Sequence, residues 1–527
     1  HGNWQGLSPG WVITIWLIHI LSEHTHCMDR VQDWVAERLH ALQVLTGQPV
    51  TALDFTDDRL GLCLRMLSQT AHWHQIEAQV GSHLVRVYQL GEEEPTVRLD
   101  ATTGTVYHDP DRHPLFQVGK AKNGQYATQY KMMLASLDPL GLSLVVDIVP
   151  GNRADDPLYI PCYQRVKTVL PTNGLLVVGD SKMSALATRA TIVAGKDYYL
   201  TPLAYRKDEP ALLETLLAPW KDREAEMALV FWPEDLPEDE GSPDPELALG
   251  HGFEVSRSRH ATVGDRNVTW DERLVVIRSH QYAKQGQIWL HRRLDKAEQA
   301  LRALTPPRGR GKRQIREEAQ LLAAIQRIEE KYQVADFFTY AYHQEVTERQ
   351  IRAYGDRPAR TERTVRFQLE VTRCSQAIAD AEFRTGWRVY ATNAPATHLT
   401  FSQVVIAYRD QYLEENVFRR LQGKVLSILP VYVQRDDHAK GLFHLLTLAA
   451  RLLALGDYLA KQALAREQTE LAGIYPGNPK RSTATPTTER MLAVFNNIQL
   501  LRVPVGGRIH SQVTPLTDVQ RRILALW

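Results

Sequence analysis

The feature that most constrains the fold of this chain is a short apolar run that ends on a carboxylate. Residues 175–178 read Leu-Leu-Val-Val, and Gly179, Asp180 and a segment of helical character follow them. An uninterrupted apolar run of this length is typical of a strand buried on both faces of a parallel sheet. A carboxylate at the carboxyl end of such a strand lies where open α/β sheets usually bind ligands. The alternative is that Asp180 caps a helix beginning at Ser181, because Asp and Ser are common N-cap residues.

The segments around this run predict further strands and helices in a defined order. A strand is expected first, then two strands that flank a Pro-Gly turn as an antiparallel hairpin, then a helix, the apolar strand, a second helix and a last strand. The segments other than the apolar run and its helix are 96–109, 129–137, 142–152, 155–170 and 197–203. This order of elements is that of a ribonuclease-H-like fold.

We therefore expect an α/β protein with a ribonuclease-H-like mixed sheet core. A large mixed α/β insertion interrupts this core, and helical N-terminal and C-terminal regions flank it. The expected parts are a helical N-terminal domain that is either a scaffold or a DNA-reading module (1–92), the first part of the sheet core (93–204), the insertion domain (205–385), the second part of the core (386–460) and a C-terminal region (461–527).

Charge and cysteine content limit the classes of partner and compartment. The chain has 62 Lys and Arg against 61 Asp and Glu, a formal net charge of +1, so a polyanion must be bound by local patches rather than by the overall field. Its 4 cysteines are widely spaced and form neither a disulfide framework nor a zinc motif, which is consistent with a reducing cytoplasm. The apolar residues 11–21 are too short to span a bilayer and predict a buried helix.

Several motifs together identify a family. The segments "VRLDATT", "FQVGKAKNG", "LDPLGLSLVVDIVPGNRADDPLY", "GLLVVGDSKMSALATRA", "YYLTPL" and "YRDQYLEENVFRRLQGKVLSILPVY" resemble bacterial insertion-sequence transposases of the DDE superfamily, of the insertion-sequence-four-like group. The resemblance covers nearly the whole chain. It implies a nucleoid-associated enzyme that cleaves transposon ends and transfers them into target DNA, acting as a homodimer on the terminal inverted repeats.

The resemblance also implies three catalytic acids, Asp100, Asp180 and Glu415. In this family such acids bind two Mg²⁺ ions, for which Mn²⁺ can substitute, and carboxylate oxygens are the ligands that Mg²⁺ prefers. The alternation in the first strand places Asp100 on the opposite face from its apolar neighbours. Glu415 lies in a strongly helical segment, where we expect it to share a face with Tyr408 and Phe418. Two alternatives for the third acid are the adjacent Glu414 and a merely solvated Glu415.

The chain also departs from its family at two basic positions. Where relatives tend to carry an Arg three residues after Tyr408 and a Lys seven after Glu415, this chain has Gln411 and Gln422. The loss of these phosphate contacts leaves a second hypothesis open, a catalytically degenerate or domesticated DNA-binding descendant. A likeness of "VVGDSKM" to the metal-binding loop of haloacid-dehalogenase-like phosphatases fails, because those enzymes need an acid where this chain has Thr102.

Besides the three acids, several basic side chains are candidates for contacts with DNA. The densest group lies in a Gly- and Pro-containing stretch suited to following a phosphate backbone. The alternative is that this stretch is only a solvated loop, for which the same composition is typical. A second group follows near the C-terminus. The candidates are Arg308, Arg310, Lys312, Arg313, Arg419, Lys480 and Arg481.

Overall fold

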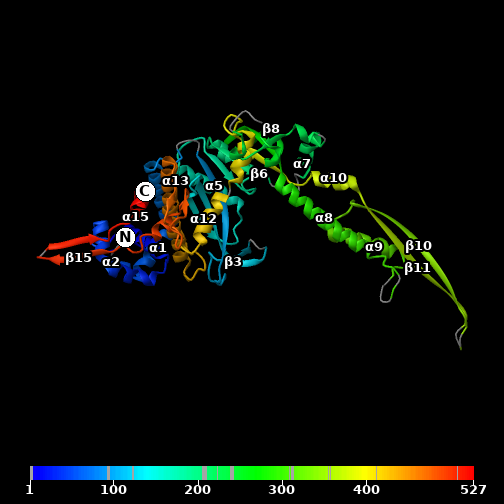
Figure 1. The fold of residues 1–527 in the computed structure, drawn as a ribbon, viewed down its shortest axis with the longest axis horizontal. Coiled ribbons are helices and arrows are strands. Elements are labelled where there is room, and N and C mark those ends of the chain that lie inside the picture. The colour runs from blue at the N-terminus through cyan, green and yellow to red at the C-terminus, as the bar shows by residue number, and fades with distance from the viewer. Residues whose placement is uncertain are drawn as a thin grey trace. The chain divides into compact units, whose positions relative to one another are not determined.

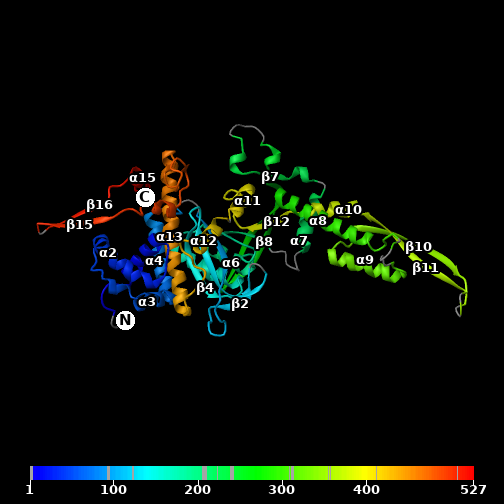
Figure 2. The same ribbon diagram turned by 60° about the horizontal axis from the view of Figure 1, so that its bottom comes forward.

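The structure is a computed structural model, and its elements divide into two compact units. It describes residues 4–91, 95–121, 124–203, 210–221, 223–237, 243–307, 309, 314–353, 355, 358–410, 412–506 and 508–527. The first unit comprises His1–Ala204, Ser256–Arg273 and Ala391–Trp527, and the second comprises Tyr205–Val255 and Leu274–Tyr390. Figures 1 and 2 show the elements of both units in two views, and each unit is described by itself below.

The first unit begins with four helices that share a core with the rest of the unit. The helices are α1 (Pro9–Glu23), α2 (Val31–Thr46), α3 (Asp57–Ser68) and α4 (Thr70–Val87). Helix α1 contains the apolar run 11–21 and buries Val12, Ile15, Trp16 and Ile20, so the prediction of a buried helix is confirmed. The apolar faces of these helices join one hydrophobic cluster with residues of the sheet and of the long C-terminal helix α13 (Asp436–Glu467).

The sheet of the first unit has the strand order of a ribonuclease-H-like core. Its strands are β1 (Thr96–Thr105), β2 (Gln117–Lys120), β3 (Tyr126–Leu137), β4 (Leu142–Pro150), β5 (Leu176–Gly179) and β6 (Tyr198–Pro202). Strand β3 pairs antiparallel with β1 and β4, and β5 pairs parallel with both β1 and β6. The order β4-β3-β1-β5-β6, with β2 beside β3, confirms the predicted fold class.

Two helices follow the strands of this sheet in the predicted order. Helix α5 (Tyr159–Val169) contains Pro161 in its first turn, where the missing N–H leaves no helical hydrogen bond unmade. Helix α6 (Leu186–Ala194) follows β5. Both helices bury one face, which for α5 comprises Tyr159, Cys162, Tyr163, Val166 and Val169.

Helix α13 is the central helix of the first unit. It packs against α1, α3, α12 (Tyr412–Gln422) and β4. In the described part of the chain it is the helix long and apolar enough to cross a membrane, but 67% of its apolar window is buried inside the structure. Its apolar face therefore serves the protein core.

The C-terminal region of the first unit follows α13. It contains the short pair β13 (Leu471–Ala472) and β14 (Ser482–Thr483), then α14 (Thr488–Ala493). A two-stranded hairpin of β15 (Leu500–Val505) and β16 (Arg508–Val513) precedes the last helix, α15 (Asp518–Leu526).

The second unit is mixed α and β, as predicted for the insertion. It contains α7 (Pro210–Leu217), β7 (Ala228–Val230), α8 (His280–Arg302), α9 (Glu318–Tyr332), α10 (Ser375–Phe383) and a long hairpin of β10 (Phe338–Ile351) and β11 (Arg360–Arg373). Helices α8 and α9 and this hairpin share one apolar core. Strands β8 (Gly250–Val263), β9 (Arg266–Ser279) and β12 (Trp387–Thr392) contribute residues to both units. The five domain boundaries remain predictions.

One buried histidine makes the first unit sensitive to acid. His444 on α13 stacks on Trp73 with ring centroids 4.1 Å apart, and its Nδ1 lies 2.8 Å from the Leu67 carbonyl oxygen. Burial lowers the pKa of His444 from 6.5 to about 3, and the nearby charges of Lys440 and Arg165 act in the same direction. The folded protein therefore keeps this imidazole neutral at pH values where the unfolded chain protonates it.

We expect the free energy of unfolding to fall as pH drops from 6.5 towards 3, because the unfolded state then binds a proton that the folded state does not. Below pH 6.5, His444 alone lowers the free energy of unfolding by up to about 1.4 kcal/mol for each pH unit of acidification. Above pH 6.5 the imidazole is neutral in both states and this loss is absent. Urea denaturation between pH 7.5 and 5 checks this, with His444→Gln expected to flatten the dependence. The matched control His72→Gln changes an exposed residue of α4 and should leave the slope unchanged. Equal slopes for wild type and His444→Gln would contradict the prediction.

Candidate active site

Asp100 lies in the middle of the first unit's sheet, on strand β1. Antiparallel pairing places it opposite Leu134 of β3, and parallel pairing on the other edge matches Leu99 with Gly179 of β5. The side chain is half-buried, and its Oδ1 accepts a hydrogen bond of 2.8 Å from the Ala101 amide. The carboxylate thus lies on a rigid central strand.

Asp180 follows the last residue of β5 and does not cap a helix. Helix α6 begins only at Leu186, with Ala185 at its N-cap position, so the alternative of a helix starting at Ser181 is wrong. The four residues 181–184 form turns instead, and the Asp180 Oδ1 accepts a hydrogen bond of 2.8 Å from the Lys182 amide. The side chain therefore stabilises the turn, as Asp does in an Asx-turn.

The hydroxyl group of Tyr159 holds the same oxygen of Asp180. Tyr159 lies at the first position of α5 and donates a hydrogen bond of 2.6 Å to Asp180 Oδ1. Thr201 of β6 donates one of 2.7 Å to the Asp180 carbonyl oxygen. Within the part of the chain that the structure describes, Asp180 Oδ2 accepts no hydrogen bond. One carboxylate oxygen is thus oriented by the protein, while the other is available to a ligand.

Gly179 allows the turn after Asp180 to pack closely on the sheet. A Cβ atom at this position would lie 2.7 Å from Met183 Sδ and 3.2 Å from the Leu99 carbonyl oxygen. A larger residue here would have to displace the Met183 side chain, so glycine allows the turn to lie close against β1.

The buried carboxylate of Glu272 braces the helix that follows this turn. Its oxygens accept hydrogen bonds of 2.6 Å from the Tyr199 hydroxyl and the Arg257 Nε, and it forms an ion pair with Arg189 of α6. Arg189 in turn donates from Nε to the Ser184 carbonyl oxygen at 2.9 Å. Burial alone would raise the pKa of Glu272, but the arginines and the Tyr199 hydrogen bond lower it below its ordinary value. The ionised carboxylate thus fixes α6 and the end of the Asp180 turn.

The parallel register brings two of the predicted acids to the same edge of the sheet. Because Leu99 is the partner of Gly179, Asp100 and Asp180 are the next residues on their neighbouring strands. Residues in register on adjacent parallel strands point to the same face, and the strands lie about 4.8 Å apart. The register therefore makes the two aspartates close neighbours at the point where the parallel pairing of β1 and β5 ends.

Glu415 lies on α12, a separate helix from the one that carries Tyr408. The predicted continuous helix is wrong here, because α11 (Phe401–Arg409) ends before α12 begins, so Tyr408 and Glu415 do not share one helical face. Helix α12 packs against β1, the strand of Asp100, and buries Val417, Phe418 and Leu421. Glu415 is exposed. The side chain of Glu414, its competitor, lies outside the described residues.

A complete metal-binding group is not formed by the described side chains. In the described ranges, no three His, Cys, Asp or Glu residues are grouped so that they could hold a metal ion. The structure therefore makes Asp100, inside β1, and Asp180, just after β5, neighbours in register, and it packs the helix of Glu415 on β1 without grouping the three carboxylates.

The predicted DNA contacts, together with the two positions where the family's basic residues are missing, fall into two groups. Arg308, Arg310, Lys312, Arg313 and Gln411 lie outside the described residues. Arg419, Lys480, Arg481 and Gln422 are exposed side chains of the first unit, and the Arg481 guanidinium lies 4.2 Å from the ring centre of Tyr475. Contact of Arg419, Lys480 and Arg481 with DNA remains a prediction, whereas Gln411 and Gln422 mark the basic residues that this chain lacks.

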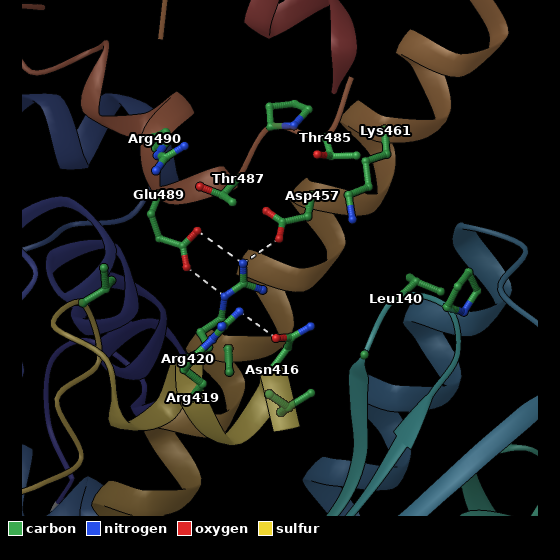
Figure 3. Close-up of a pocket in the computed structure, with 16 residues that line it drawn as sticks. Leu140, Asn416, Arg419, Arg420, Asp457, Lys461, Thr485, Thr487, Glu489 and Arg490 are labelled. Atoms are coloured by element: carbon green, nitrogen blue, oxygen red, sulfur yellow. Dashed lines mark hydrogen bonds and ion pairs between the residues drawn. The ribbon is translucent and has the colours of Figure 1, made fainter. Parts of the chain in front are cut away.

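A hollow of about 550 Å³ lies beside α12, and its charged lining was not predicted apart from Arg419. Figure 3 shows Arg420 at its centre, paired with Asp457 of α13 at 2.5 Å and with Glu489 of α14 at 2.8 Å. Lys461 and Arg490 also line it. These residues lie on three helices and far apart in the sequence, so no local pattern could have identified them. Tyr159 was likewise missed, although it lies within the motif "DDPLY".

Comparison with known protein families identifies the family of this chain. The family model described as "Transposase DDE domain" matches residues 92–452, a range that contains Asp100, Asp180 and Glu415. The chain belongs to the DDE transposase family. No curated protein matches this sequence. Membership in the DDE transposase family assigns the chain, in general terms, to the enzymes that act on DNA during transposition.

Proposed function

We propose that this DDE transposase is an insertion-sequence enzyme of the insertion-sequence-four-like group that cuts its transposon ends and joins them to target DNA. The observation that carries the proposal is the parallel register of β1 and β5, which makes Asp100 and Asp180 neighbours at one edge of the sheet. Ligand sites of α/β sheets lie at this edge. Glu415 is proposed as the third acid, since its helix packs against the strand of Asp100.

Asp100, Asp180 and Glu415 would hold two Mg²⁺ ions in this proposal. The donor set fits, because it consists of carboxylate oxygens only, and Asp180 presents one oxygen without a hydrogen bond in the described structure. When bound, such ions activate the attacking oxygen and stabilise the leaving one. Glu415 would complete the ligand set, and Tyr159 and the Lys182 amide keep the Asp180 carboxylate oriented.

The reaction has two in-line displacements at phosphorus. In the first, a water oxygen forms a bond to the phosphorus at the transposon end, and the bond from phosphorus to the 3′ oxygen breaks to leave a free 3′-hydroxyl. In the second, this 3′-hydroxyl attacks a phosphodiester of the target and displaces a target 3′ oxygen. Two ends must be processed together, so we propose that the enzyme acts as a homodimer.

Metal dependence tests this proposal. We expect the purified protein to cleave a duplex carrying the inverted repeats that flank its coding sequence when Mg²⁺ or Mn²⁺ is present. Chelation with EDTA should abolish cleavage while leaving binding of the duplex measurable, because the acids act in chemistry and the basic side chains in binding. Cleavage that persists in EDTA would contradict the proposal. Binding without nicking in either metal would instead support a catalytically degenerate DNA-binding protein, the hypothesis raised by Gln411 and Gln422.

A further inference from the structure

The hollow beside α12 continues along α13 as a groove. A second hollow of about 380 Å³ adjoins the first and shares Pro139, Leu140, Asp457 and Lys461 with it. Residues Pro139 and Leu140 belong to the turn between β3 and β4. We call the two hollows together the α12–α13 groove. All of its lining residues belong to the first unit.

The lining of the α12–α13 groove has an excess of positive charge. Four cationic side chains and two carboxylates line the larger hollow, which leaves two charges in excess. Both carboxylates, Asp457 and Glu489, form ion pairs with Arg420. Among the residues that the structure describes, no carboxylate lies within ion-pair distance of the other three cations. These are Arg419, Lys461 and Arg490.

The three cations of the groove are exposed but not all of them are free to move. Arg419 donates from Nη2 to Asn416 Oδ1 at 2.6 Å, and the Arg490 guanidinium lies 4.7 Å from the ring centre of Tyr475. Such contacts hold a guanidinium in place before a ligand binds, which lowers the entropy lost on binding. The groove thus presents oriented positive charges to solvent.

The arrangement of the cations suits a chain of phosphates better than a single one. Figure 3 shows Arg419, Lys461 and Arg490 at separate sides of the hollow, where they do not converge on one point. They come from α12, α13 and α14 respectively. A site for one free phosphate would need donors that meet at one place, whereas a nucleic-acid backbone offers anionic groups along its length.

The groove also lies next to the proposed third acid. Arg419 follows Glu415 by four residues on α12, so the two side chains share a helix face about 6 Å apart along the axis. A strand bound along the groove therefore passes the helix that carries Glu415.

We propose that the α12–α13 groove binds the phosphodiester backbone of the DNA strand on which the enzyme acts, with Lys461 and Arg490 as contacts not previously assigned. This inference rests on the proposed function and extends it by naming a second set of phosphate contacts. The contacts position the strand and carry no base specificity, because they reach only phosphates.

Lys461→Gln, Arg490→Gln and the double variant test the inference. The probes are an inverted-repeat duplex and a random duplex of equal length, titrated in EDTA at several salt concentrations. Each substitution is expected to weaken binding of both duplexes about tenfold. The salt slope of log K should fall by about 0.9 per charge removed.

The matched control is Arg466→Gln, which removes an exposed cation further along α13 that does not line the groove. It should leave affinity and salt slope unchanged. All the substituted side chains are exposed, so the variants should keep their thermal stability. A double variant that binds DNA like the wild type, with the same salt slope, overturns the inference.

Titration with inorganic phosphate at constant ionic strength tests whether the groove binds a DNA backbone or a free phosphate ion. If phosphate binds the wild type and not the double variant, while DNA affinity is equal for both, the groove is a free-anion site and the inference is wrong. If the wild type cleaves end DNA and the variants match it in affinity, the inference fails while the proposed function stands. If the wild type binds neither duplex, both fail together.

Discussion

Asp180→Asn is expected to lower the rate of end-DNA cleavage by at least about a thousandfold, equivalent to about 4 kcal/mol of transition-state stabilisation. The change is nearly isosteric. An asparagine Oδ1 can still accept the hydrogen bonds from the Tyr159 hydroxyl and the Lys182 amide, so the turn after β5 should persist. What is lost is the negative charge at the sheet edge beside Asp100. Single-turnover cleavage of the inverted-repeat duplex in Mg²⁺ measures the effect.

Three comparisons test whether Asp180→Asn acts on the chemical step. Binding of the duplex in EDTA should match the wild type, because the substitution removes no cation. Asp33→Asn, at an exposed position of α2, should cleave normally. Tyr159→Phe removes one hydrogen bond to Asp180 and leaves its charge, so it should lower the rate by less than Asp180→Asn does. If Asp180→Asn cleaves DNA at the wild-type rate, Asp180 is not a catalytic acid.

The sheet could be predicted from the sequence because its strands have strong local signals. The apolar run before Gly179 and the Pro-Gly turn at 139–141 predicted β5 and the β3–β4 hairpin, and the structure has both. In the structure, the pairing of β1 with β3 on one side and with β5 on the other sets the order and register of these three strands. The neighbouring placement of Asp100 and Asp180 is a consequence of this register, which the family resemblance anticipated.

The start of the helix after Asp180 could not be predicted from local signals. Asp and Ser favour both N-caps and Asx-turns for the same reason, since their side chains accept hydrogen bonds from nearby backbone amides. Here the Asp180 side chain bonds the Lys182 amide in a turn, and the helix starts five residues later than expected. The break between α11 and α12 escaped prediction because residues 401–422 contain neither Gly nor Pro.

The charge of the α12–α13 groove depends on pairings that only the tertiary structure shows. Arg419 and Arg420 are adjacent and equivalent in sequence. In the structure Arg420 pairs with Asp457 and Glu489, whereas Arg419 contacts the neutral Asn416. Which arginine is available to a phosphate is therefore decided by carboxylates 37 and 69 residues away.

A buried ion network gives the second large expected effect, this time on stability. Glu77 of α4 is 1% exposed and pairs through one oxygen with Arg165 of α5 and through the other with Arg451 of α13, at 3.3 Å. It also accepts a hydrogen bond of 2.8 Å from the Val146 amide of β4. One carboxylate thus ties three helices and a strand of the first unit together. Arg451 is 1% exposed and has no other carboxylate within ion-pair distance in the described structure.

Glu77→Gln is expected to lower the free energy of unfolding by about 3–5 kcal/mol, because it leaves the Arg451 guanidinium buried without a counter-charge. Urea denaturation and amide hydrogen exchange at Val146 both measure the loss. Glu37→Gln, which breaks a surface pair with Arg38, should cost less than about 1 kcal/mol.

Replacing both partners, Glu77→Leu with Arg451→Leu, should recover part of the loss, since it removes the unpaired buried charge along with the pair. A Glu77→Gln protein as stable as Glu37→Gln would show that the network is solvated and that packing alone joins α4 to the sheet. The helices before residue 92 would then be held to the catalytic core by apolar contacts rather than by this carboxylate.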